Sequence, residues 1–389
     1  MDIIFMFIGS LFLVFLAFNP LISDFYKFPS KMMGRKRFLA MGSYKYAKEY
    51  FEYYREHRGG LIQGQQVGTE FYDEFARKRQ DNYKLYEKNV EKIEEANSLL
   101  KTMNKTFTLS TNQYADVIDL DDKNKPDLMI NPVIDNQFRP ETYLKIFQTP
   151  FPYIETIINQ NKKMTYNWND TGLLSPVKNQ GQCGSCWAFS VTSSIETFMR
   201  INGYNVDRLS EQELVDCSTE NYGCNGGLMH LAFEYIMKEK GLSKNRDYPY
   251  KALDQNCSCH LPYTNSSCTI PKATGSNLQD YHFVIPNSVL DMKLNVIKTP
   301  ITLAIDADNV FFRFYESGVI DLPANYSKSM NHAVLLVGFD YDDDGMYWII
   351  QNSWGKEWGD NGFCKVRVRP DAGVLSCQQY GVYPVEIKK

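Results

Sequence analysis

Apolar residues follow two different spacings along the chain. Between residues 69 and 100 they recur loosely every three or four positions among many charged residues, as in a long surface helix. Residues 186–201 and 229–240 show the same spacing with fewer charges, and Gly203 and Gly241 follow them as helix stops. After about residue 281 the pattern changes to short apolar runs separated by turn-forming residues, which predicts an antiparallel sheet or barrel. These runs are 301–305, 333–339, 347–351 and 363–368. A helical half followed by a β half predicts an α+β fold with a cleft between the two.

Composition divides the chain near residues 160–165. Residues 24–162 are rich in Lys, Glu, Asn and Tyr and contain no cysteine, whereas all nine cysteines and all five tryptophans lie beyond residue 164. Within the first part, residues 107–116 alternate like a strand, and the proline-containing residues 119–152 are predicted to be an extended linker. We therefore expect three regions, residues 1–23, 24–161 and 162–389.

The start of the chain indicates export. Ile3–Phe18 is apolar, short for a membrane span and about right for a signal-peptide core. Basic residues follow it, so an uncleaved membrane anchor is the alternative. Possible glycosylation sites also favour export, and they lie at Asn104, Asn169, Asn265 and Asn325. A net charge of -4 and a pI near 5.8 give no sign of a nucleic-acid partner.

The strongest chemical signal is the run Gln180-Gly-Gln-Cys-Gly-Ser-Cys-Trp. Its second cysteine, Cys186, stands where a glycine-containing turn enters the predicted helix 186–201. Backbone N–H groups at a helix N-terminus stabilise an anion, which predicts a lowered thiol pKa and a nucleophilic thiolate. The same N–H groups, with the Gln180 side chain as a second donor, can receive an oxyanion.

A thiolate nucleophile needs an imidazole beside it as acid and base. Of the five histidines, His332 alone stands at the start of an apolar strand, in Met-Asn-His-Ala-Val-Leu-Leu-Val-Gly. Asn352 follows the run 347–351 and can accept a hydrogen bond from the His332 ring, while Trp354 can shield that bond from water. These residues predict peptide hydrolysis by a cysteine–histidine pair through an acyl-enzyme.

This pattern resembles the papain family of cysteine proteases, and most of all its cathepsin L-like group. Cys-Gly-Ser-Cys-Trp, with His and Asn far downstream, is typical of that family. The likeness covers about residues 165–385 and includes Leu-Ser-Glu-Gln-Glu-Leu-Val-Asp-Cys (209–217), Gly-Cys-Asn-Gly-Gly (223–227) and Asn-Ser-Trp-Gly (352–355). It implies a papain-like fold with a helical left domain, a barrel-like antiparallel right domain and an active-site cleft between them. The implied roles are nucleophile for Cys186, acid and base for His332, orienting group for Asn352 and oxyanion donor for Gln180.

The region before this domain resembles the inhibitory propeptide of the same family. Asn89, Ile93 and Asn97 share one helix face and match the second half of the ERFNIN motif, whereas Lys78 and Asn82 depart from its first half. Residues 112–116 resemble the short GNFD element. The resemblance implies a zymogen whose propeptide blocks the cleft, and we expect processing near residues 161–165.

Two disulfides, Cys183–Cys224 and Cys217–Cys257, are implied by the resemblance. The third bridge familiar in the family lacks its partner cysteine here. We expect Cys259–Cys268 and Cys364–Cys377 as bridges particular to this chain, which leaves Cys186 as the free thiol.

The resemblance also implies a substrate site. Gly226 and Gly227 resemble an edge that hydrogen-bonds an extended peptide. An apolar pocket for the second residue before the scissile bond is expected from Leu228, Met229, Met330 and Ala333, with Trp354 near the bond and Tyr380 as a candidate for the pocket base. Expected partners are peptide and protein substrates, the propeptide and cystatin-type inhibitors, for a monomer in a lysosome-like acidic compartment or outside the cell. Neither a cofactor nor a metal is expected.

Other classes of protein share parts of this pattern. Cys183-x-x-Cys186 also fits a redox pair, and crowded cysteines fit a zinc site. A redox pair does not require His332 or Asn352, and the cysteines are spread too widely for a compact zinc site. An inactive binding homologue is a further alternative, but its usual mark is loss of the nucleophile or the histidine, and both are present.

Overall fold

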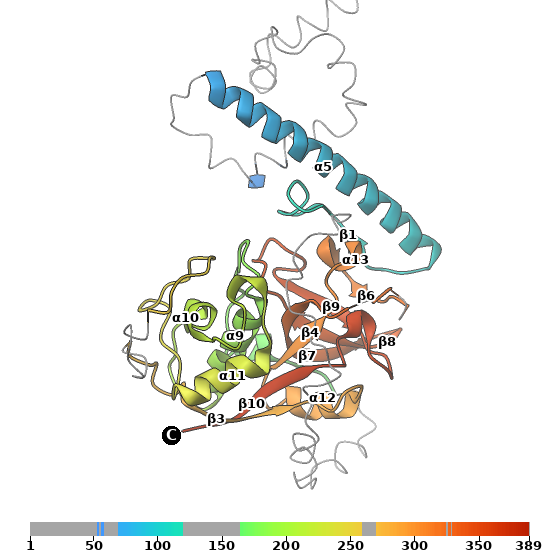
Figure 1. The fold of residues 1–389 in the computed structure, drawn as a ribbon. Coiled ribbons are helices and arrows are strands. Elements are labelled where there is room, and N and C mark those ends of the chain that lie inside the picture. Colours follow the sequence, from blue (N-terminus) through green and yellow to red (C-terminus); the bar gives the residue numbers. More distant parts are fainter. Residues whose placement is uncertain are drawn as a thin grey trace, which may run out of the picture. The chain divides into compact units, whose positions relative to one another are not determined.

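The computed structural model describes Tyr53, residues 56–57, 69–119, 164–258, 270–323, 326–327 and 329–388, with the backbone alone for residues 69–80 (Figure 1). The chain divides into compact units of residues 1–67 and 68–389, and every element named below belongs to the second. None of the helices in the described part is long and apolar enough to cross a membrane. The predicted signal-peptide core and the predicted linker from residue 120 onward lie outside the described residues.

Three helices form the first part of the cysteine-rich domain: α9 (Cys186–Ile201), α10 (Glu211–Cys217) and α11 (Met229–Lys238). Helix α9 has the predicted bounds. Helix α11 ends earlier than predicted, because Lys240 and Gly241 adopt φ angles of 58° and 134° that no α-helix continues. Ser210 caps α10 by accepting a hydrogen bond from the Glu213 N–H. The short 3-10 helix η3 (Trp168–Thr171) precedes α9, and η4 (Gly223–Asn225) lies between α10 and α11.

The second part is a mixed sheet in the order β3-β10-β4-β7-β8-β9-β6, with β2 paired to β7. All pairs are antiparallel except β6 and β9. The strands are β2 (Tyr166–Asn167), β3 (Leu278–Phe283), β4 (Ile301–Ile305), β6 (Val319–Ile320), β7 (His332–Asp342), β8 (Gly345–Gln351), β9 (Phe363–Arg367) and β10 (Gly381–Ile387). Helix α12 (Val289–Val296), helix α13 (Val310–Arg313) and η6 (Val374–Ser376) connect them. The four predicted apolar runs are thus β4, β7, β8 and β9.

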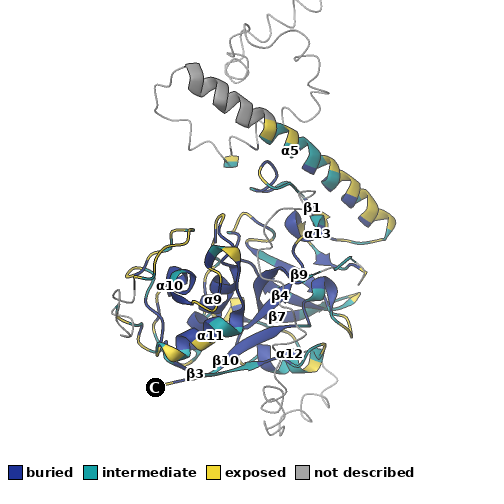
Figure 2. Ribbon diagram, viewed as in Figure 1, coloured by how far each residue is buried: buried dark blue, intermediate teal, exposed yellow. Residues whose placement is uncertain are grey.

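Helix α9 joins the two parts. It is buried from Cys186 to Met199, and it packs both on α10 and α11 and on strands β4, β7 and β10. Helices α9, α10 and α11 lie together on one side of the sheet in Figure 1, and Figure 2 shows buried residues where they meet the strands. The α+β arrangement predicted from the apolar spacing is therefore correct.

The predicted helix of the leader is α5 (Thr69–Thr102), and its polar residues hold the segment that follows it. The Asn89 amide donates to the carbonyls of Ala115 and Ile118, at 2.9 and 2.8 Å. Asn97 donates to the Leu109 carbonyl at 2.9 Å and accepts from its N–H at 3.0 Å. Ile93 lies between the two asparagines and is buried, so the face shared by these three residues is the packed one.

The predicted strand 107–116 is wrong in length. Only β1 (Thr108–Leu109) is strand, and the chain turns from Asn112 onward. The Asn112 carbonyl and side chain accept hydrogen bonds from the N–H groups of Ala115 and Tyr114. An asparagine side chain offers the backbone this alternative to strand pairing, which alternation of apolar residues does not reveal.

The segment after α5 contacts the sheet domain through backbone pairing. Strand β1 pairs antiparallel with β5 (Tyr315–Ser317), and the Ser110 N–H donates to the Phe314 carbonyl at 2.9 Å. Gly318 has a φ of +89°, and a Cβ there would lie 2.6 Å from the Phe107 Cα. A side chain at residue 318 is therefore incompatible with this close backbone approach.

A buried ion network holds α9, α10 and the segment before α9 together. The Lys178 ammonium donates to Glu196 and Glu211, at 2.7 Å each, and to the Thr192 hydroxyl at 3.0 Å. All of these side chains are buried. Burial alone would raise the pKa of Glu211, but the Lys178 and Arg208 charges hold it below its ordinary value.

Replacing this lysine tests the network. Lys178→Met leaves two buried carboxylates without their cation, and we expect a loss of about 3–5 kcal/mol in the free energy of unfolding. Urea unfolding of the purified precursor, followed by tryptophan fluorescence, measures that loss. Lys238→Met on the exposed surface of α11 is the matched control, with an expected change below about 0.5 kcal/mol. Equal midpoints for the two variants would contradict a structural role for the network.

Candidate active site

Cys186 is the first residue of α9, and its thiol is fully buried. Burial raises the pKa of this thiol to about 12, although the backbone N–H groups of Ala333, Trp187 and Cys186 itself act to lower it. The lowered pKa predicted from the helix N-terminus is therefore wrong for this structure, because loss of solvent outweighs the N–H groups. The Ala333 N–H also places the thiol beside the residue that follows His332.

His332 begins β7, opposite Ile305 on β4. Its ring Nε2 lies 2.8 Å from Asn352 Oδ1, and that oxygen also accepts from the Ser353 N–H at 2.8 Å. A backbone N–H must meet the oxygen of an amide, so it fixes the Asn352 orientation and makes Nε2 the donor. The neutral ring consequently carries its hydrogen on Nε2. Its Nδ1 makes no hydrogen bond within the described part of the chain.

Aromatic rings cover His332. The Trp354 indole lies 4.8 Å from the imidazole between ring centroids, and Phe312 lies at 6.0 Å. Burial, helped by the Arg313 charge, lowers the pKa of His332 to about 3, despite the opposing effect of the Asn352 hydrogen bond. In this buried state, the Cys186 thiol and the His332 imidazole are thus both favoured as neutral groups.

Gln180 is held by a residue that the sequence did not single out. The Ser353 hydroxyl donates to Gln180 Oε1 at 2.7 Å, and the Gln180 N–H donates to the Ser353 carbonyl at 2.9 Å. The Gln180 amide nitrogen donates one hydrogen to the Cys183 carbonyl at 2.9 Å and carries a second. Ser353 therefore positions both Gln180 and Asn352, and its place between two candidate residues was the available signal.

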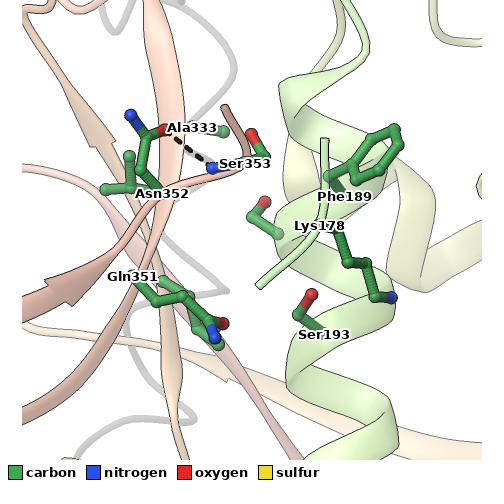
Figure 3. A pocket seen from close by; sticks show the side chains of 10 residues that line it. Lys178, Phe189, Ser193, Ala333, Gln351, Asn352 and Ser353 are labelled. Carbon is green, nitrogen blue, oxygen red and sulfur yellow. Dashed lines mark hydrogen bonds between the residues drawn. The ribbon is translucent and has the colours of Figure 1, made fainter. Parts of the chain in front are cut away.

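A small cavity lies behind these residues, where α9 meets the sheet. Its volume is about 10 Å³, enough for one water molecule. Figure 3 shows Gln351, Asn352 and Ala333 on the strand side and Phe189 and Ser193 on the side of α9. Lys178 of the ion network also lines it, so the network and the candidate site share a wall.

Two of the expected disulfides are present, Cys183–Cys224 and Cys217–Cys257. Gly184 follows the first of them, and a Cβ there would lie 2.4 Å from the Cys224 carbonyl oxygen. A side chain at this position would displace the turn that leads to Cys186.

The expected Cys364–Cys377 disulfide is wrong, because both residues are free thiols. Both are fully buried, and burial raises the pKa of each thiol, to about 12 for Cys377. Such thiols stay protonated and pack as small apolar side chains, and counting cysteines cannot distinguish this case from a bridge. The expected Cys259–Cys268 bridge falls outside the described residues.

The residues expected to form the apolar pocket lie in one buried cluster with Cys186: Leu228, Met229, Met330, Ala333 and Tyr380. The Tyr380 hydroxyl lies 2.6 Å from His230 Nδ1. Of the two glycines, Gly226 already accepts a hydrogen bond at its carbonyl from the Tyr222 N–H, at 3.0 Å. A Cβ at Gly227 would lie 2.5 Å from Asn221 Oδ1, so this position requires glycine.

Two observations concern the alternatives of a redox pair and a zinc site. Cys183 is bonded to Cys224, so it does not form a dithiol with Cys186. Across the described residues, no group of three or more His, Cys, Asp or Glu side chains is arranged to hold a metal ion.

Known proteins with the same arrangement were found by sequence and by structure. Residues 163–384 match the family described as papain family cysteine protease. Procathepsin L of Rattus norvegicus is 36% identical over 72% of this chain and 79% of its own length. Cathepsin L2 of Homo sapiens is 34% identical over the same shares.

Solved precursors extend the likeness to the leader. The recombinant stem bromelain precursor matches with a TM-score of 0.68 and 28% identity, over 87% of this chain and 98% of its own. A digestive procathepsin L2 proteinase from the larval midgut of Tenebrio molitor matches with a TM-score of 0.67 and 28% identity, over 87% and 99%. The chain therefore belongs to the papain family of cysteine proteases, as a cathepsin L-like endopeptidase in its propeptide-bearing form.

Proposed function

We propose that this precursor gives rise to an endopeptidase in which Cys186 attacks the scissile carbonyl and His332 transfers the protons. The observation that carries the proposal is the fixed tautomer of His332. With Nε2 donating to Asn352, Nδ1 is the nitrogen able to take the thiol proton. Because Ala333 bonds to the Cys186 sulfur through its N–H, the thiol lies next to the histidine that it needs.

The steps follow from these positions. His332 Nδ1 takes the thiol proton, and the thiolate forms a bond to the carbonyl carbon. The oxyanion that results is stabilised by the Cys186 N–H and the second hydrogen of the Gln180 amide. Imidazolium then protonates the leaving amine, which departs as the acyl-enzyme forms. A water molecule, deprotonated by His332, hydrolyses that thioester and restores the thiol.

We further propose that the leader inhibits the enzyme by desolvation as well as by blocking the cleft. Gln113 donates to the Trp354 carbonyl at 2.7 Å, and the Tyr114 ring packs edge-to-face on the Trp354 indole at 5.3 Å. These contacts lie over the aromatic cover of His332. Removal of the leader admits solvent, which favours the charged thiolate–imidazolium pair over the neutral one.

The cluster around Tyr380 supports a preference for an apolar residue at the second position before the scissile bond. Its lining residues are apolar, and the Tyr380 hydroxyl is tied to His230. We propose that this pair closes the base of the pocket and that Gly227 supplies the backbone edge for the peptide.

The two disulfides support folding in the secretory pathway, where such bonds persist. Asn104 and Asn169 are exposed, as glycosylation there requires. We propose an acidic lysosome-like compartment or secretion as the destination, residues 1–23 as the signal peptide and processing near residues 161–165.

The proposed mechanism is tested on the processed enzyme. Peptides with a leucine or phenylalanine at the second position before the bond should be cleaved, and an epoxide thiol reagent should label Cys186 selectively. Cys186→Ser and His332→Ala should each lower kcat/KM by about 10³ or more, because each removes a group that forms bonds or moves protons. His282→Ala in β3 is the control, with activity retained. Cleavage by Cys186→Ser at the wild-type rate would overturn the proposal.

Ser353 tests how the oxyanion donor is positioned. In Ser353→Ala the Gln180 amide loses its hydroxyl partner, and we expect kcat to fall about tenfold while KM changes little. The pH profile should keep its shape, because the backbone N–H that fixes Asn352 remains. Ser353→Thr retains the hydroxyl and should restore most of kcat. An equal loss in both variants would point to packing instead.

Desolvation by the leader is tested on the full-length precursor. Tyr114→Ala opens the cover over Trp354, so iodoacetamide should alkylate Cys186 at least about tenfold faster than in the wild type, as read by peptide mapping of the unprocessed band. Val117→Ala changes an exposed residue of the same segment and should react like the wild type. Identical rates in all three proteins would refute the role given to Tyr114.

A further inference from the structure

Arg313 is a buried cation near His332, and the proposed mechanism assigns it no role. Arg313 ends helix α13 and is 5% exposed. Its guanidinium lies over the Trp354 indole, 4.9 Å from the ring centroid, and the His332 ring contacts the same indole at 4.8 Å. The guanidinium and the imidazole are therefore within about 10 Å of each other, the reach of two or three extended residues.

The hydrogen-bonding capacity of this guanidinium is largely unused. Its Nε is buried and has no hydrogen-bond acceptor within the described part of the chain. Its Nη2 forms an ion pair with Asp308 Oδ1 at 3.8 Å, which is longer than a hydrogen bond. A guanidinium presents five donors in a fork that matches a carboxylate, and the long ion pair with Asp308 leaves those donors without close acceptors among the described residues. The position therefore suits an anion supplied from outside the domain.

The leader covers this arginine in the precursor. Tyr114 packs on Trp354, and the Asn112 amide donates to the Arg313 carbonyl at 2.8 Å. Both residues belong to the propeptide, which processing removes. The mature enzyme consequently presents Trp354 and Arg313 together at the site, without that cover.

The side of the scissile bond follows from the chemistry of His332. The imidazolium protonates the leaving amine, so the residues after the bond lie on the His332 side. Arg313 shares Trp354 with His332, whereas the pocket for residues before the bond includes Leu228 and Met229 from the helical domain. We propose that Arg313 is a specificity-determining residue that binds a carboxylate on the first or second residue after the scissile bond. The inference rests on the proposed function.

A peptide supplies such a carboxylate from an Asp or Glu side chain or from its own C-terminus. The test uses the processed wild-type enzyme and internally quenched peptides of one sequence, with an amidated C-terminus and either Glu or Gln at the first or second position after the bond. We expect kcat/KM to favour Glu by about tenfold, less at high salt. A further pair, ending one residue after the bond with a free or amidated terminus, separates the terminal carboxylate from the side chain.

Variants assign the preference to Arg313. Arg313→Gln should bring the Glu-to-Gln ratio close to one, and Arg313→Lys should keep part of it, because the charge remains while the fork is lost. The ratio is measured within each variant, so a change in overall activity through His332 does not affect it. Arg369→Gln removes an exposed arginine elsewhere and should leave the ratio at its wild-type value.

The outcomes separate this inference from the proposed function. A wild-type enzyme that cleaves all the peptides without favouring any carboxylate would overturn the role of Arg313 alone. A preference that survives in Arg313→Gln would do the same. If Arg313→Gln does not fold, the wild-type ratio and Arg313→Lys decide. Failure of the wild-type enzyme to cleave any peptide would overturn the proposed function itself.

Discussion

The contact between helix α9 and strand β7 is the constraint on which the rest of this structure depends. Cys186 is the first residue of that helix and His332 the first residue of that strand, so their packing sets the distance between thiol and imidazole. Two sets of contacts hold this packing in place. Lys178 joins α9 to α10 through Glu196 and Glu211. Ser353 bonds to Asn352 after β8 and to Gln180 before α9. The proposed catalytic pair depends on this contact, because one group comes from a helix and the other from the sheet.

Burial acts on this pair in two opposing ways. It fixes the groups, since a side chain packed on all sides has one conformation. It also penalises charge, and in the covered state that penalty exceeds the help of the helix N-terminus. The proposed proton transfer needs the fixed side chains, but the penalty on charge opposes it. The inhibition proposed above would resolve the conflict with a removable cover that includes Tyr114, which packs on Trp354.

Much of this architecture was predictable because it rests on periodicity and on short motifs. The apolar spacing predicts α9 and the four central strands, and the motif residues Cys186, His332 and Asn352 stand where their elements begin or end. The rest depends on surroundings that spacing does not encode. The pKa of Cys186 is set by its burial, and Cys364 and Cys377 are separate buried thiols. The turn at Asn112 replaces a strand through a side-chain hydrogen bond, and Ser353 acts on Gln180, which is far away in sequence.

Gly318 lies where the leader backbone closely approaches the sheet domain. No side chain fits at this position because the Phe107 backbone passes within 2.6 Å of where a Cβ would be. Phe107 belongs to the leader, so on the proposed processing this clash exists only in the precursor, whereas the φ of +89° restricts residue 318 in the processed enzyme as well. The processed enzyme would thus retain a glycine that the removed segment also required. A substitution there would strain the backbone at every stage through its φ angle, and in the precursor it would also displace the leader.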